Sequence, residues 1–172
     1  KGRTQHYSKW RQARFINISF GYGITTSALQ MLLAVSAIAN DGIAVKPQLI
    51  LPKKSIKQPG KRIISKKTAN KMTQLMIQVT AEEGTGTLAQ IPGIITAGKT
   101  GTTEKIDHSG SYSNKLNMAS FVGFAPAHKP KLAAIVIIDE PQISSYGGLV
   151  AAPAWQKIMA AALAIEESYA KE

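Results

Sequence analysis

Two runs of mainly apolar residues, 118–124 and 132–139, constrain the fold most, because only a short turn-forming segment, A-P-A-H-K-P, joins them. The second run is rich in Val and Ile, which favour β-strands. Two such runs with a short connection predict an antiparallel hairpin. A third strand is predicted over 94–103, followed by a polar loop that reaches Lys115.

Three helices are predicted around these strands. Residues 28–39 are apolar almost all round and follow the N-cap candidate Ser27, which predicts a helix buried on most of its faces. Residues 66–82 have apolar side chains at helical spacing after the N-cap candidate Ser65. Pro153 is expected in the first turn of a closing helix, where proline is tolerated. The sequence therefore predicts an α+β fold with helices flanking an antiparallel sheet.

Two further segments are expected to be extended. Residues 16–20 alternate like a short strand before a glycine-containing break. Residues 43–51 resemble a short extended segment, although Pro47 argues against a central strand there. A basic segment with proline and glycine follows over 52–64.

The charge of the 172-residue chain is unevenly distributed. The net charge is +11, and residues 1–81 contain 14 Lys and Arg but a single acidic residue, Asp41. Such asymmetry can mark a surface for nucleic acid or anionic membrane, while a solvated face is the simpler interpretation. The basic residues between 53 and 67 have no aromatic residues among them, and single-strand binders use such residues for stacking. We therefore expect no nucleic-acid partner.

Composition excludes several kinds of site. The absence of cysteine removes disulfides, thiol catalysis and cysteine-based metal sites. His6, His108 and His128 are not spaced as ligands of one metal ion. No uninterrupted apolar run reaches the ~18 residues of a membrane span. We expect neither a metal nor an organic cofactor.

The clearest chemical motif is Lys99-Thr100-Gly101-Thr102-Thr103, which falls on the predicted strand 94–103. Lys99 provides a positive charge, and the threonine hydroxyls can donate to a carboxylate. Gly101 leaves room for a ligand's backbone along the strand. A strand-edge N–H beyond this glycine could stabilise an oxyanion. On these residues alone, an ordinary edge strand with a surface lysine is an equal alternative.

The motif and its surroundings resemble the transpeptidase domain of class B penicillin-binding proteins, which shares its K-T-G motif with serine β-lactamases. The segments that support this resemblance, in the family's order, are S-F-G-Y-G (19–23), 26–31, E-G-T-G-T (83–87), A-G-K-T-G-T (97–102), F-V-G-F-A-P (121–126), D-E-P-Q (139–142) and Y-G-G-L-V-A-A-P (146–153). Together they span about 17–165. The first and last segments resemble division (septal) enzymes more than elongation enzymes.

The chain departs from the family pattern in its nucleophile. The family uses a serine in S-x-x-K and a second motif, S-x-N, both before K-T-G. This chain has no S-x-N, and its only S-x-x-K is 168–171, after Lys99 and close to the end, which we interpret as coincidence. The resemblance therefore implies that residues 1–172 form the C-terminal part of a transpeptidase domain, with 1–16 and 166–172 peripheral. We expect the chain alone to be inactive.

The resemblance implies a β-lactamase/DD-transpeptidase-like fold and a peptidoglycan D,D-transpeptidase that cross-links D-Ala-D-Ala stem peptides through a serine acyl-enzyme and binds β-lactams. Lys99, Thr100 and Gly101 would be catalytic, and Thr100, Thr102, Thr103 and Tyr22 would bind substrate. The Thr102 N–H would be an oxyanion donor. Cell-division proteins are possible partners. The parent protein would lie on the periplasmic side of the inner membrane, anchored by a segment outside this chain.

Two alternatives remain from the sequence. A basic domain could bind anionic lipid, cell-wall polymer or a division protein without chemistry. A β-lactam sensor domain would share K-T-G but not the Gly-Tyr-Gly (21–23) and Tyr-Gly-Gly (146–148) contexts.

Overall fold

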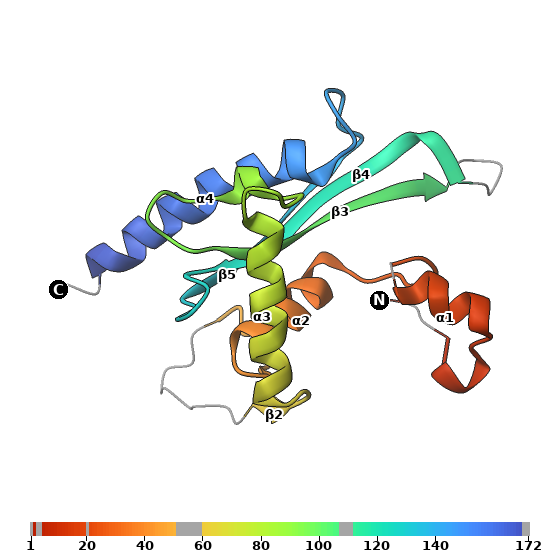
Figure 1. Cartoon of the computed structure of the whole chain (residues 1–172), viewed down its shortest axis with the longest axis horizontal. Helices are drawn as coiled ribbons and strands as arrows, with labels where there is room; N and C mark the ends of the chain where they lie inside the picture. The colour runs from red at the N-terminus through yellow and green to blue at the C-terminus, as the bar shows by residue number, and fades with distance from the viewer. Residues whose placement is uncertain (1, 3–4, 20, 51–59, 107–111, 170–172) are drawn as a thin grey trace.

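A three-stranded antiparallel sheet lies at the centre of the computed structural model (Figure 1), which describes residues 2, 5–19, 21–50, 60–106 and 112–169. Its strands are β3 (Ala97–Ile106), β4 (Tyr112–Ala125) and β5 (Leu132–Asp139), with β4 in the middle. The predicted hairpin of β4 and β5 is confirmed, with Ala125 opposite Leu132.

The predicted polar loop up to Lys115 is wrong in its second half, because β4 already begins at Tyr112. Pairing of β3 with β4 continues past a register shift after Glu104, so that Ile106 lies opposite Tyr112. The extra pairing satisfies backbone groups that a loop would expose to water. Residues 107–111, which include His108, lie outside the described residues.

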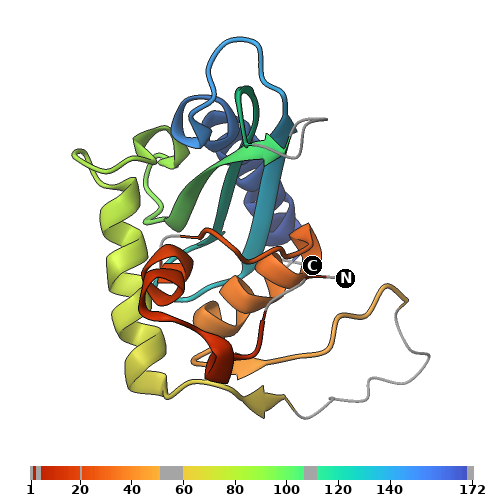
Figure 2. The same ribbon diagram turned by 90° about the vertical axis from the view of Figure 1, so that its right-hand side faces the viewer.

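Helices cover both faces of this sheet (Figure 2). On one face, Phe121 packs edge-to-face against Trp155 of α4, with ring centroids 5.1 Å apart. On the other face, Val122 and Phe124 pack in a cluster with Val35 of α2 and Met76 of α3. Since both faces are buried, apolar residues occupy successive positions rather than alternate ones, as in the Val- and Ile-rich β5.

Helix α4 (Gly147–Tyr169) starts earlier than the sequence predicts. Pro153 lies inside the helix rather than in its first turn, because Leu149 and Val150 already donate their N–H groups to the Tyr146 carbonyl. Proline at 153 leaves the Leu149 carbonyl without its usual donor, and Leu149 is exposed to water that can replace it.

By length and composition alone, α4 is also apolar enough to cross a membrane. Its buried side chains, Trp155, Met159 and Leu163, pack in the cluster that includes Phe121 and Ala125 of β4. In this structure α4 is therefore a core helix of the sheet.

The other two predicted helices form where expected. Helix α2 (Ala28–Ala39) begins with a capping box between Ser27 and Gln30, and α3 (Lys66–Thr80) begins after the N-cap Ser65. The prediction that α2 is buried on most faces is wrong. Only Val35 and Ala37 are buried, because α3 and the sheet pack on one side of α2 within the described part of the chain.

The prediction of an extended segment at 16–20 is wrong as well. Residues Gln12–Ser19 form helix α1, which has no buried residue and follows a 3-10 turn, η1 (Tyr7–Lys9). An alternation of four or five residues is too short to exclude a helix. Phe20 lies outside the described residues.

The expected extended segment at 43–51 is confirmed only at its start. It forms β1 (Ile43–Ala44), which pairs with β2 (Lys61–Arg62). Residues 51–59, most of the basic segment, lie outside the described residues.

A buried polar network joins α3 to the start of β3. The Thr80 Oγ1 atom lies 2.9 Å from the carbonyl oxygens of both Ile77 and Thr96, and Gln90 donates to the Thr80 carbonyl at 2.7 Å. Thr80 and Thr96 are both buried. Because Thr96 directly precedes β3, this contact helps to fix where the strand begins.

We expect Thr80→Val to destabilise the protein by about 1–3 kcal/mol, because the buried Thr96 carbonyl loses its side-chain donor while the shape of residue 80 hardly changes. The measurement is the free energy of unfolding of the complete protein in urea. Thr73→Val is the matched control, since its hydroxyl donates only to the Ala69 carbonyl within the same helix. Equal effects of the two substitutions would contradict the assigned role of Thr80.

Candidate active site

The K-T-G residues lie on β3, which is an edge strand of the described sheet. Lys99 is opposite Val122, Thr100 opposite Phe121 and Gly101 opposite Ser120. β4 occupies one side of β3, so the other side of β3 presents backbone groups to a ligand. The side chains of Lys99, Thr102 and Thr103 are also exposed.

A cation and two hydroxyl groups meet at Thr100. The Lys99 Nζ atom lies 3.0 Å from the Thr100 carbonyl oxygen and 3.3 Å from its Oγ1 atom. The Thr85 hydroxyl approaches the Thr100 hydroxyl at 3.0 Å from the loop that follows α3. Hydroxyl donors beside an ammonium group match a carboxylate, whose hydrogen bonds to charged donors are the stronger kind.

The first turn of α4 borders the same site. The Gly147 N–H donates to Thr102 Oγ1 at 3.4 Å, which ties the helix start to the motif strand. A Cβ atom at Gly147 would overlap the Ser120 carbonyl oxygen and lie 2.6 Å from that of Gly101. A Cβ atom at Gly148 would overlap the Thr85 carbonyl oxygen. These two glycines therefore permit the close approach of α4, β3 and the Thr85 loop.

The backbone direction of β3 follows from the Lys99 contact. Since Lys99 reaches the Thr100 carbonyl, that carbonyl points away from the β4 ladder. Peptide groups of residues two apart on a strand point the same way, so the Thr102 N–H belongs to the same edge as the Thr100 carbonyl. A carbonyl oxygen placed along this edge could accept from it.

The structure brings some of the predicted residues together. Lys99 contacts Thr100, and Thr102, two residues beyond Thr100, contacts Gly147 at the start of α4. Gly101 and Thr103 are the neighbours of Thr102 on β3. Tyr22 lies on a separate segment, in the turn after α1, where its N–H donates to the Asn17 carbonyl and its side chain is partly exposed.

Sequence reasoning missed the roles of Thr85 and Gly147. A signal for Thr85 was present, because a hydroxyl residue between two glycines in Gly84-Thr85-Gly86 allows close backbone approach. The glycine pair 147–148 is a similar signal. Neither pattern indicates which strand the segment contacts. Only the structure shows that Thr85 contacts Thr100 and that Gly147 contacts Thr102.

Comparisons with known proteins identify the family of the chain. Residues 2–160 match the penicillin binding protein transpeptidase domain. The chain is 38% identical over 165 residues to the probable peptidoglycan D,D-transpeptidase PenA of Neisseria gonorrhoeae, covering 95% of this chain and 28% of PenA. It is 35% identical over 156 residues to the peptidoglycan D,D-transpeptidase FtsI of Escherichia coli, covering 90% of this chain and 26% of FtsI.

The fold agrees as well. The apo transpeptidase domain of Burkholderia pseudomallei penicillin-binding protein 3 superimposes with a TM-score of 0.87 at 32% identity, covering 95% of this chain and 50% of that structure. The predicted α+β, transpeptidase-like fold is thus confirmed. The chain spans less than a third of the length of these two curated relatives and about half of that solved structure. The sequence matches and the fold together show that the chain belongs to the penicillin-binding protein transpeptidase domain family.

Proposed function

We propose that this chain is part of a peptidoglycan D,D-transpeptidase and supplies the strand that holds the acyl donor. The observation that supports this most is the contact of the Thr100 hydroxyl with the Lys99 ammonium group and the Thr85 hydroxyl on β3, with the Thr102 hydroxyl two residues further along the strand beside Gly147. A stem peptide that ends in D-Ala-D-Ala has a terminal carboxylate next to the reacting carbonyl, and these donors match both groups.

In this proposal Thr100 and Thr102 hold the terminal carboxylate by their hydroxyls. The Thr102 N–H donates a hydrogen bond to the carbonyl oxygen as negative charge develops on it, as one donor of an oxyanion hole. Gly101 leaves space for the donor's backbone, and Lys99 supplies positive charge and supports proton transfer. Thr103 and Tyr22 are predicted to contact more distant parts of the substrate.

The reaction itself needs a serine that this chain does not provide in the family's order. The serine oxygen attacks the carbonyl carbon of the penultimate D-Ala, and collapse of the tetrahedral intermediate breaks the peptide bond and releases terminal D-Ala. The amine of a second stem peptide then attacks the acyl-enzyme, forms the cross-link and returns the serine. A β-lactam places a carboxylate and a reactive carbonyl in the same positions and remains at the acyl stage. No step requires a metal or an organic cofactor.

We further propose a role in cell division for the parent protein. The similarity to FtsI supports this, together with the Ser19–Gly23 and Tyr146–Gly148 sequences that resemble division enzymes. The parent protein would work on the periplasmic side of the inner membrane, held by an anchor outside this chain, and cell-division proteins would be its partners.

Lys99→Ala should lower the second-order rate of acylation by a soluble penicillin by on the order of 100-fold in the complete transpeptidase, because a preorganised charge is lost beside the oxyanion and the carboxylate. The melting temperature should change little, since Lys99 is exposed. Thr102→Ala should have a smaller effect, because it keeps its backbone N–H. Lys129→Ala, an exposed lysine in the turn between β4 and β5, is the control.

If Lys99→Ala reacted as fast as the wild type, the K-T-G strand would not be part of the site. A large fall in melting temperature would instead make Lys99 a structural residue and would contradict the assignment in the same way.

The 172-residue chain alone should not be acylated. Its only S-x-x-K serine is Ser168, and the Ser168 hydroxyl donates to the Ile165 carbonyl at 2.7 Å on the last turns of α4. The assay is a denaturing gel after incubation with a fluorescent penicillin, with a complete transpeptidase as the positive control. A covalent band on the isolated chain would contradict the proposal that the nucleophile comes from elsewhere.

A further inference from the structure

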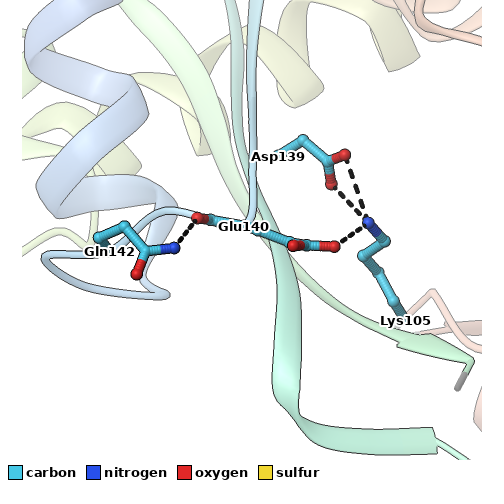
Figure 3. Close-up of polar contacts among 4 residues, drawn as sticks. All are labelled: Lys105, Asp139, Glu140 and Gln142. Carbon is cyan, nitrogen blue, oxygen red and sulfur yellow. Dashed lines mark hydrogen bonds and ion pairs between the residues drawn. The ribbon is translucent and has the colours of Figure 1, made fainter.

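Three charged side chains form an ion-pair cluster beyond the K-T-G residues (Figure 3). The Lys105 Nζ atom lies 3.0 Å and 3.3 Å from the two carboxylate oxygens of Asp139 and 2.5 Å from a carboxylate oxygen of Glu140. Lys105 is on β3, whereas Asp139 ends β5, so the lysine side chain spans the intervening strand β4. The cluster therefore links two strands that do not pair with each other.

The sheet register explains this reach. Thr103, Met118 and Asp139 lie opposite one another across the three strands, and Lys105 is two residues beyond Thr103. Lys105 lies at the register shift between Glu104 and Ile106, where the regular alternation of faces is interrupted, and its long side chain reaches Asp139 across the end of the regular pairing. The Lys105 side chain is 30% exposed, while the side chains of Asp139 and Glu140 are 61% and 45% exposed, so water partly screens both ion pairs. The hydrogen bonds to Glu140 and then to Asp139 raise the pKa of Lys105, so it stays protonated at neutral pH.

Glu140 is also the residue at which the chain leaves the sheet. Its φ of +50° lies in the left-handed region, which is unfavourable for a residue with a side chain. The Glu140 N–H donates to the Asn117 carbonyl at 2.9 Å, and the Gln142 side chain donates to the Glu140 carbonyl at 2.9 Å. Backbone and side-chain contacts thus hold Glu140 in this conformation at the start of the connection to α4.

Between its two ends, the connection 141–146 makes mainly contacts within itself. Within it, the Tyr146 N–H lies 3.2 Å from the Ser144 hydroxyl oxygen, and Ile143 and Tyr146 are largely exposed. At its far end, Gly147 packs on β3 and β4 and donates to Thr102. The Lys105 cluster and the Gly147 contact therefore anchor opposite ends of one short segment.

We propose that Lys105 is a positioning residue of the candidate site: by holding Asp139 and Glu140, it fixes the connection to α4 and thereby the orientation of the Thr102 hydroxyl. This inference rests on the proposed transpeptidase function. Lys105 does not need to touch the substrate. Without it, the connection shifts, the Gly147 N–H moves away from Thr102 Oγ1, and the hydroxyl no longer faces the ligand carboxylate.

The first test uses Lys105→Met in the complete transpeptidase, with the acylation rate by a soluble penicillin as the readout. Methionine keeps much of the side-chain length but removes both ion pairs. We expect a fall of roughly 2- to 30-fold, the range typical of coupling between neighbouring segments. Lys105→Arg, which can keep both carboxylates, should restore most of the rate. Lys66→Met is the matched control, because it removes the single Lys66–Asp41 ion pair near the start of α3.

The second test asks whether Lys105 acts through Thr102. In a Thr102→Ala background, Lys105→Met should cause little further loss, because the hydroxyl that it positions is already gone. Glu140→Gln keeps the shape of residue 140 and should lower the acylation rate as Lys105→Met does. It serves as the test if the Lys105→Met protein fails to fold. Fully additive losses from Lys105→Met and Thr102→Ala would overturn the proposal.

The two proposals fail differently. If Lys99→Ala abolishes acylation while Lys105→Met and Glu140→Gln match the wild type, the positioning role is wrong and the proposed function stands. If Lys99→Ala leaves the rate unchanged, the proposed function fails, and the Lys105 inference fails with it.

Discussion

The pairing of β3 with β4 is the contact on which the rest of the structure depends. Its regular part runs from Ala97 opposite Phe124 to Glu104 opposite Asn117. Within this part, alternate residues of β4 point toward two separate cores. Phe121 anchors α4 on one face, while Val122 and Phe124 anchor α2 and α3 on the other. The same register sets which backbone groups of β3 face β4 and which face the open edge. Core and candidate site therefore share one constraint.

The site itself forms where three segments far apart in the sequence converge on that edge. The Thr85 loop, the strand from Lys99 to Thr102 and the first turn of α4 meet within hydrogen-bond distance. Glycines at 147 and 148 make this convergence possible, because any side chain there would overlap backbone oxygens. At these two positions the start of α4 has no side chain that could hold it in place. The Lys105 cluster anchors the connection before the helix, and this is why the cluster matters for the Thr102 hydroxyl.

Much of this could be predicted from the sequence, for physical reasons. The Val- and Ile-rich β5 and the caps Ser27 and Ser65 specify local structure directly, and they were located correctly. Where local signals are short or ambiguous, prediction fails: residues 16–19 of the alternating segment belong to helix α1, and Pro153 lies inside α4 rather than in its first turn. Contacts such as Thr85 with Thr100 depend on tertiary packing, which no local pattern specifies. The exposure of α2 likewise depends on which elements pack against it.

The most direct test of the central claim is a crystal structure of the complete transpeptidase acylated by a penicillin. We expect the ligand carboxylate to lie within hydrogen-bond distance of the Thr100 and Thr102 hydroxyls. The acyl carbonyl oxygen should accept from the Thr102 N–H, with the Lys99 ammonium group nearby. A covalent adduct whose carboxylate points away from β3, with Thr100 and Thr102 still exposed to water, would contradict it.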